Sequence, residues 1–126
     1  MANHGTEIRP LGISRTLRAT EILEVTRVPD IQVGGVDPET TFIYGNQIGS
    51  GVTMNSLSSS ASISGFNIKY GIATRGGGMD VNGSYVHIRD IVLFENISSQ
   101  QGGGINITSG GPILTNLLIV DNTTTN

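Results

Sequence analysis

The chain has 126 residues, a formal net charge of -3 and 18 glycines, and its 13% of charged residues is about half the usual share. So small a net charge argues against nucleic acid or an anionic membrane as the partner. Aromatic residues amount to 5% and Trp is absent, which argues against a platform on which sugars or bases stack. Many glycines and few charges favour stacked strands joined by tight turns over helices, whose exposed faces need Lys, Glu and Arg.

Cysteine is absent, which excludes disulfides, thiolate metal ligands and cysteine nucleophiles and leaves the cellular compartment open. Residues 1–7 show neither the basic nor the apolar region of a signal peptide. No apolar run approaches the roughly 20 residues of a membrane-spanning helix. We therefore expect neither a signal peptide nor a membrane span within this sequence.

Residues 1–30 contain no copy of the repeat found further along the chain. We expect them to form an N-terminal cap or a segment unrelated to the repeat. Within this segment, residues 20–28 alternate partly between apolar and polar, which predicts a strand. Residues 31–33 read as a short opening strand, and the turn sequence Gly-Gly-Val-Asp-Pro follows them. The predicted organisation is an N-terminal segment, 1–30, followed by a repeat region, 31–126.

A glycine motif recurs with a fixed period. Gly-Gly-Gly-Met-Asp-Val at 76–81 returns as Gly-Gly-Gly-Ile-Asn-Ile at 102–107, a shift of 102 − 76 = 26 residues. A weaker copy, Gly-Ser-Gly-Val-Thr-Met, lies at 49–54, and 76 − 49 = 27. Recurrence at one period of this length predicts a solenoid in which each copy is one coil, and the glycines read as tight corners.

A second motif keeps step with the first. Residues 88–96 match 114–122 at a shift of 26 and 63–71 at a shift of 25, and residues 41–46 fit the second half of the motif one coil earlier. Each copy alternates with period two, which predicts strands with one buried face. The alternation predicts one buried column of stacked side chains: Ile43, Ile68, Leu93 and Ile119. The motif ends predict a ladder of stacked turn residues, in which glycine would accept a positive φ: Asn46, Gly71, Asn96 and Asn122.

These periods predict an all-β fold, a right-handed parallel β-helix (solenoid) of about three to four coils stacked roughly 4.8 Å apart. Adding one period to the last glycine triplet gives 102 + 26 = 128, just beyond residue 126. We therefore expect the sequence to be a fragment of a longer helix.

The pairing of a strand that ends in Asn with a Gly-Gly-Gly-[Met/Ile] strand start resembles right-handed parallel β-helix repeat proteins of the pectate-lyase-like superfamily. The likeness is greatest to the repeats of polymorphic outer-membrane proteins, with their Phe-x-x-Asn and Gly-Gly-Ala-Ile-like motifs. It covers residues 41–126, although Ile43, Leu93 and Ile119 stand where Phe is usual. The resemblance implies a secreted or cell-surface protein that serves as a structural stalk or as a binding or adhesion scaffold. The implied partners are flanking coils of the same longer chain, a partner subunit, a polysaccharide or a host surface.

Two other functions are consistent with a solenoid. The first is an N-terminal fragment of a β-helix polysaccharide lyase or glycoside hydrolase, whose acids and bases would lie on outward positions of successive coils. No motif of those enzymes is recognisable, and we expect no catalytic residue and no cofactor. The second is a leucine-rich-repeat recognition module, because residues 114–122 match Leu-x-x-Leu-x-Leu-x-x-Asn. The glycine-rich other half of each coil favours strand over the helix that this module needs.

The remaining polar candidates are weak. Glu95 and Asp121 occupy the same position in successive coils and form the only candidate pair for a metal ion, although two solvated acids beside a turn explain them as well. Asp90 with Asn116 is a similar outward pair that reads as turn capping.

Apolar residues at outward positions form a more informative pattern. If the predicted column faces inward, its neighbours face outward and define an interaction surface: Phe42, Tyr44, Val92, Phe94, Leu118 and Val120. Such a stripe is unusual for a free surface, so we expect a partner chain or the N-terminal segment to cover it.

Overall fold

The computed structural model describes residues 5–8, 14–17, 19–20, 22–25, 32–35, 38–39, 41–45, 47 and 49–125. All regular structure in these residues is β-strand. The strands are β1 (Gly5–Ile8), β2 (Ser14–Leu17), β3 (Ala19–Thr20), β4 (Ile22–Val25), β5 (Gln32–Gly35), β6 (Phe42–Tyr44), β7 (Val52–Asn55), β8 (Ser62–Lys69), β9 (Ile72–Arg75), β10 (Met79–Ser84), β11 (His87–Phe94), β12 (Ile97–Gln101), β13 (Ile105–Gly110), β14 (Ile113–Val120) and β15 (Thr123–Thr124).

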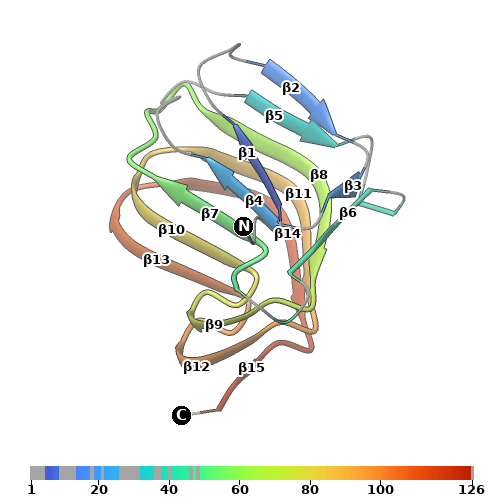
Figure 1. Ribbon diagram of the computed structural model, residues 1–126. Coiled ribbons are helices and arrows are strands. Elements are labelled where there is room, and N and C mark those ends of the chain that lie inside the picture. Colours follow the sequence, from blue (N-terminus) through green and yellow to red (C-terminus); the bar gives the residue numbers. More distant parts are fainter. Residues whose placement is uncertain are drawn as a thin grey trace.

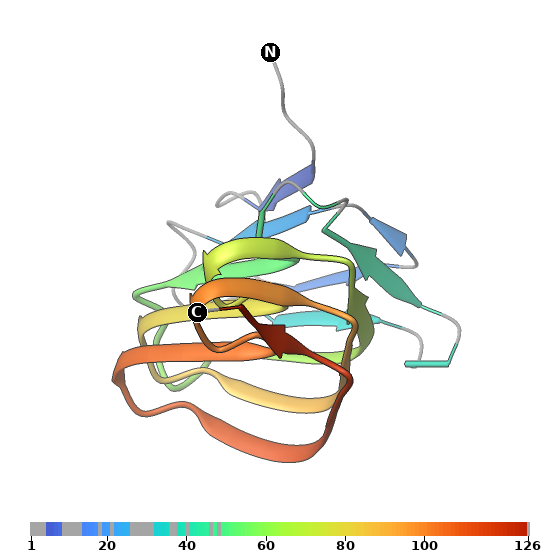
Figure 2. The same cartoon turned by 90° about the horizontal axis from the view of Figure 1, so that it is seen from below.

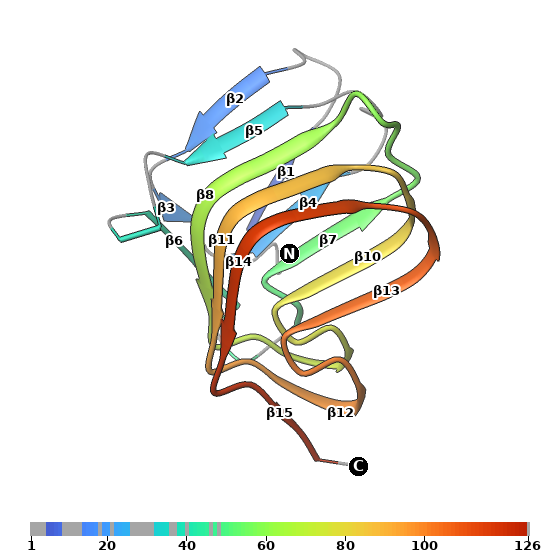
Figure 3. The same cartoon turned by 180° about the vertical axis from the view of Figure 1, so that it is seen from behind.

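The strands stack into three parallel sheets (Figure 1). Sheet A has the order β1-β4-β7-β10-β13, sheet B the order β14-β11-β8-β5-β2 with β3 and β6 at its side, and sheet C the order β15-β12-β9. One strand of each sheet makes one coil, so β7–β9, β10–β12 and β13–β15 are successive coils (Figure 3). The predicted all-β parallel solenoid is confirmed.

The strand register reproduces the sequence period. Met79 pairs with Ile105 in sheet A, and Leu93 pairs with Ile119 in sheet B, each 26 residues apart. The glycine-rich half of each coil forms the strands of sheet A. No helix is present in the described residues, so the convex helical side of a leucine-rich repeat is not seen there.

The core lies between the sheets and consists of the inward column residues. In sheet A these include Val52, Met54, Met79 and Val81, all with 0% exposure. The column predicted for sheet B is also found, since Ile43 pairs with Ile68, Ile68 with Leu93 and Leu93 with Ile119. The first three are fully buried, but Ile119 is 48% exposed. The expectation of burial is wrong for Ile119 because its coil is the last in the stack and no further coil covers it.

Each long strand of sheet B bends at one residue whose backbone has the left-handed conformation, with a positive φ. It is Gly65 in β8, Asp90 in β11 and Asn116 in β14, with φ of 85°, 53° and 54°. Strict alternation would bury every second side chain of the strand. The bent residue interrupts this pattern, so the next buried side chain after Ile88 is that of Ile91, three positions further along the chain. The bend, visible in Figure 3, turns one strand into two sides of the coil.

The corner at the end of sheet B differs from the prediction. The positive φ lies one residue before the predicted ladder, at Tyr70, Glu95 and Asp121, with φ of 63°, 55° and 56°. Gly71 has another role, because a Cβ there would collide with the carbonyl of Gly77 in the neighbouring corner. Glycine is needed at this position for the close approach of two backbone segments.

The glycine triplets are the tight corners that the sequence predicts. Gly76 and Gly102 adopt φ of 63° and 62°. The following glycines lie against the next coil, where a Cβ on Gly77 would meet the carbonyl oxygens of Ile97 and Gly103. Only glycine permits this stacking of one corner on another.

The strands of the N-terminal segment continue the sheets. β1 pairs with β4 and β4 with β7 in sheet A, while β2 pairs with β5 and β3 with β6 in sheet B, all in parallel. The apolar residues of this segment that we expect as a cover for the outward stripe are Leu17 in β2 and Ile22, Leu23 and Val25 in β4. They lie within strands that extend the solenoid.

Candidate binding surface

The outward face of sheet B carries two columns of large side chains after its bend. Tyr44, Lys69 and Phe94 share one register, and Val120 continues it. This column continues beyond the strand end into Tyr70, which is 38% exposed at the corner. We call Phe42, Tyr44, Tyr70 and Phe94 the aromatic cluster.

Lys69 lies at the centre of the aromatic cluster. Its Nζ is 4.8 Å from the ring centroid of Tyr70, 5.2 Å from that of Phe94 and 5.7 Å from that of Phe42. A cation within about 6 Å of an aromatic face gains roughly 0.5–1 kcal/mol at an exposed site. One ammonium shared by three rings fixes the position of the lysine and leaves its charge at the surface.

The rings also stack on one another. Phe42 and Tyr44 have centroids 5.7 Å apart with an interplanar angle of 21°, and Tyr44 and Tyr70 are 6.0 Å apart at 15°. The chain has three Phe and three Tyr in total, so four of its six aromatic residues gather in one place. The low aromatic content therefore does not exclude a stacking platform, because the fold concentrates the few rings present.

The six residues of the predicted interaction surface share one face but differ in exposure. Phe42, Tyr44, Val92 and Phe94 are half-buried. Leu118 and Val120, on the last coil, are 57% and 37% exposed. The predicted interaction surface does not include Lys69, which pairs in register with Tyr44 and Phe94, or Tyr70, which lies one residue past the strand. The sequence offers one signal for Tyr70. It directly follows Lys69, whose strand position pairs with Tyr44 and Phe94.

Asn67 lies between Phe42 and Val92 in the second column. Its Oδ1 is buried without a hydrogen-bond partner. An unsatisfied buried oxygen costs about 1–3 kcal/mol.

The turn ladder is a chain of hydrogen bonds along the solenoid. Asn96 Oδ1 accepts from the backbone N–H of Gly71 at 2.9 Å, and Asn96 Nδ2 donates to the carbonyl of Ile68 at 2.9 Å. The same Nδ2 donates to Asn122 Oδ1 at 2.9 Å, which joins the next coil. Asn46, the first predicted member, lies outside the described residues. These bonds give the ladder a structural role between coils.

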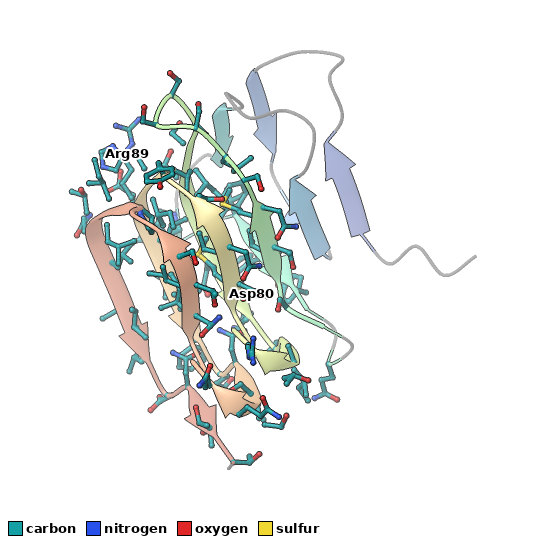
Figure 4. All side chains as sticks on the ribbon, turned by 90° about the vertical axis from the view of Figure 1, so that its left-hand side faces the viewer. Asp80 and Arg89 are labelled. Carbon is teal, nitrogen blue, oxygen red and sulfur yellow. The ribbon has the colours of Figure 1, made fainter. Side chains whose placement is uncertain are left out.

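The outward face of sheet A carries a second polar network, which the sequence did not reveal. Asp80 accepts from Asn106 Nδ2 at 3.1 Å and from Asn82 Nδ2 at 3.3 Å, one bond to each carboxylate oxygen. Asn82 Nδ2 also donates to Asn55 Oδ1 at 3.0 Å. Figure 4 shows Asp80 on this face. Because the side chains bond to one another across three coils, this face has less to offer a ligand than the aromatic cluster.

Glu95 and Asp121 both lie at left-handed corner positions and both are exposed. In the described part of the chain, no group of three or more His, Asp or Glu side chains could hold a metal ion. Ca²⁺ takes six to eight oxygen ligands, and two exposed carboxylates alone fall short of that number. The outward pair Asp90 and Asn116 is joined by a hydrogen bond of 2.7 Å from Asn116 Nδ2 to Asp90 Oδ1.

Two basic residues, His87 and Arg89, lie near the start of β11. His87 Nε2 lies 2.9 Å from Thr115 Oγ1 at the start of sheet B. Arg89 is exposed and lies well away from Asp80 (Figure 4).

Within the described ranges, no helix is long and apolar enough to cross a membrane.

Comparison of the chain with protein-family models, with curated proteins and with solved structures found no match. The fold and the geometry of its surfaces are therefore the basis for an assignment of function.

Proposed function

We propose that the protein is a binding scaffold, a β-solenoid whose stacked coils display the aromatic cluster and the adjoining apolar residues of sheet B to a partner. The observation that carries this proposal is the position of Lys69, surrounded by three aromatic rings from successive coils on an outward face. The resemblance of the glycine and asparagine motifs to surface β-helix repeats supports a secreted or cell-surface location.

The physical argument rests on the kind of side chains displayed. Tyr and Phe provide large contact areas with only two rotatable side-chain bonds, so little conformational entropy is lost when a partner binds. The ring contacts already hold Lys69 and the aromatic side chains in place before binding. A rigid aromatic patch with one cation at its centre is suited to a glycan or to a protein surface that carries both apolar and acidic groups.

The stacking of the coils lengthens this surface along the solenoid axis. The outward columns continue from the aromatic cluster through Val92 to Leu118 and Val120 on the last coil. The two columns follow the solenoid axis across successive coils. This arrangement favours an extended partner that runs across several coils.

Binding to a glycan array and to intact cells tests the proposal. Replacement of an anchoring tyrosine at an interface typically costs about 2 kcal/mol, which is roughly a 30-fold rise in Kd. We expect Tyr70→Ala and Lys69→Ala to weaken binding to whichever probe the protein recognises. Tyr85→Ala is the matched control, because Tyr85 is 53% exposed and lies outside the aromatic cluster. Equal losses for Tyr70→Ala and Tyr85→Ala, or no binding to any probe, would contradict the proposal.

A further inference from the structure

The outward face of sheet B carries charges of both signs on adjacent coils. Lys69 lies at the end of β8, and Glu95 directly follows β11 at the corner of the next coil. The two corners are neighbours, because the backbone N–H of Tyr70 donates to the carbonyl oxygen of Glu95 at 3.1 Å. Within the described part of the chain, neither charged group makes an ion pair. A cation and an acid thus lie on one face without pairing with each other.

The rings of the aromatic cluster are engaged with one another. Tyr44 stacks on both Phe42 and Tyr70, and the ammonium of Lys69 lies over the rings of Phe42, Tyr70 and Phe94. A sugar that stacks flat on an aromatic side chain needs a free ring face. The ammonium and the exposed part of Tyr70 are better suited to a protein surface that offers apolar and acidic side chains.

The residues of this face differ from coil to coil in a complementary way. Figure 2 shows the successive coils stacked in sequence order, from green to red. On the outer two of the four coils that carry the face, Phe42 and Tyr44 are aromatic, and Leu118 and Val120 are aliphatic. The coil that ends in Lys69 and the coil that ends in the corner of Glu95 lie between them. Leu118 and Val120 share the outward register of Val92 and Phe94, so a further coil would lie beside them and would not cover them.

We propose that this face of sheet B binds the same face of a second copy of the chain, side by side and with the two solenoid axes antiparallel. This inference rests on the proposed function, because it names the partner of the same surface. A two-fold axis along the strands, midway between β8 and β11, places each of these coils against the other coil of the second copy. Lys69 of each copy then meets Glu95 of the other copy, and the aromatic outer coil meets the aliphatic outer coil.

The direction of the two-fold axis follows from the charges. An axis along the solenoid would keep Lys69 level with Lys69 of the second copy, and Glu95 level with Glu95, and like charges across an interface weaken binding. The antiparallel arrangement pairs opposite charges and closes after two copies. Four coils measure about 14 Å from the first strand to the last. The contact is therefore small, and we expect a reversible dimer with a Kd on the order of 10–100 µM.

Sedimentation equilibrium of the purified chain at up to about 1 mM tests the proposal. The chain has a mass of 13.2 kDa, so the dimer has 2 × 13.2 = 26.4 kDa. Lys69→Glu and Glu95→Lys should each weaken association by roughly 100-fold, because each creates two like-charge contacts. An equimolar mixture of these two variants should recover most of the association, because both of its contacts then join a lysine to a glutamate. Arg89→Glu is the control and should dimerise like the wild type, because Arg89 is exposed and lies outside the face, before the bend of β11.

Circular dichroism checks that the variants keep their strands. Lys69→Gln replaces Lys69→Glu if the latter does not fold, and it should weaken association roughly tenfold. A wild-type chain that stays at 13.2 kDa over this range would overturn the proposal. A mixture of the two charge variants that stays monomeric, or an equal loss with Arg89→Glu, would also overturn it. The assay needs only the purified chain, so a monomer that binds glycans or cells would refute this inference and leave the proposed function standing.

Discussion

Replacing Leu93 by alanine should lower the free energy of unfolding by about 3–4 kcal/mol. Leu93 has 0% exposure and lies between Ile68 and Ile119 in the inward column of sheet B. The change removes three carbon atoms, worth about 0.8 kcal/mol each, and the cavity left in a rigid stack adds roughly 1 kcal/mol. Leu118→Ala provides the control, because Leu118 is the same residue type on the next coil but is 57% exposed. Its cost should stay within about 0.5 kcal/mol.

Thermal and urea unfolding followed by circular dichroism measure both variants. For a chain of this size a loss of 3–4 kcal/mol corresponds to a fall in Tm of about 10–15 °C. Leu93→Asp should not fold at all, since an unpaired buried carboxylate costs several kcal/mol more. If Leu93→Ala and Leu118→Ala reduced stability equally, the inward and outward assignment of sheet B would be wrong.

The other predictions concern the ladder, the corners and the acidic pair. Asn96→Ala should lower the free energy of unfolding by about 2–3 kcal/mol, because it leaves the buried N–H of Gly71 without its hydrogen bond. Chemical unfolding measures this, and an unchanged free energy would mean that the ladder is not a structural element. Gly77→Ala should prevent folding or lower Tm by more than 10 °C, on the order of several kcal/mol, since its Cβ would strike neighbouring carbonyl oxygens; a fully stable variant would refute the close corner packing. Glu95→Gln with Asp121→Asn should leave Tm unchanged with or without Ca²⁺, and no turnover of acidic polysaccharides is expected; calcium-dependent stabilisation lost in the double variant would establish a metal site instead.

The sequence predicted the inward columns because a period of two within a period of 26 leaves little choice of register. Ile68 and Leu93 could be paired from their spacing alone, and the structure pairs them. The glycine corners were equally accessible, because a triplet that recurs with the coil has few explanations other than close backbone packing. The inward columns and the glycine corners could both be predicted because the same residue types recur at the same position of each coil.

The left-handed corners and the aromatic cluster were less accessible. Glu95 carries no local signal for a positive φ, whereas Asp is among the non-glycine residues that adopt this conformation most often, as Asp121 does here. Tyr70 and Lys69 join the cluster because their side chains reach across neighbouring coils, which strand alternation does not describe. Ile119 is exposed because it lies on the last coil described, where no further coil covers it.

Methyl–methyl nuclear Overhauser effects test the parallel stacking of the repeats most directly. In a selectively methyl-labelled sample, Ile68 should show contacts to both Ile43 and Leu93, because these residues pair in register on adjacent coils. Ile43 and Leu93 lie two coils apart, roughly 10 Å along the axis, and should show little or no direct contact. This pattern would establish the order of the coils. Absence of the Ile68–Leu93 contact, with both side chains assigned and the protein folded, would contradict the solenoid.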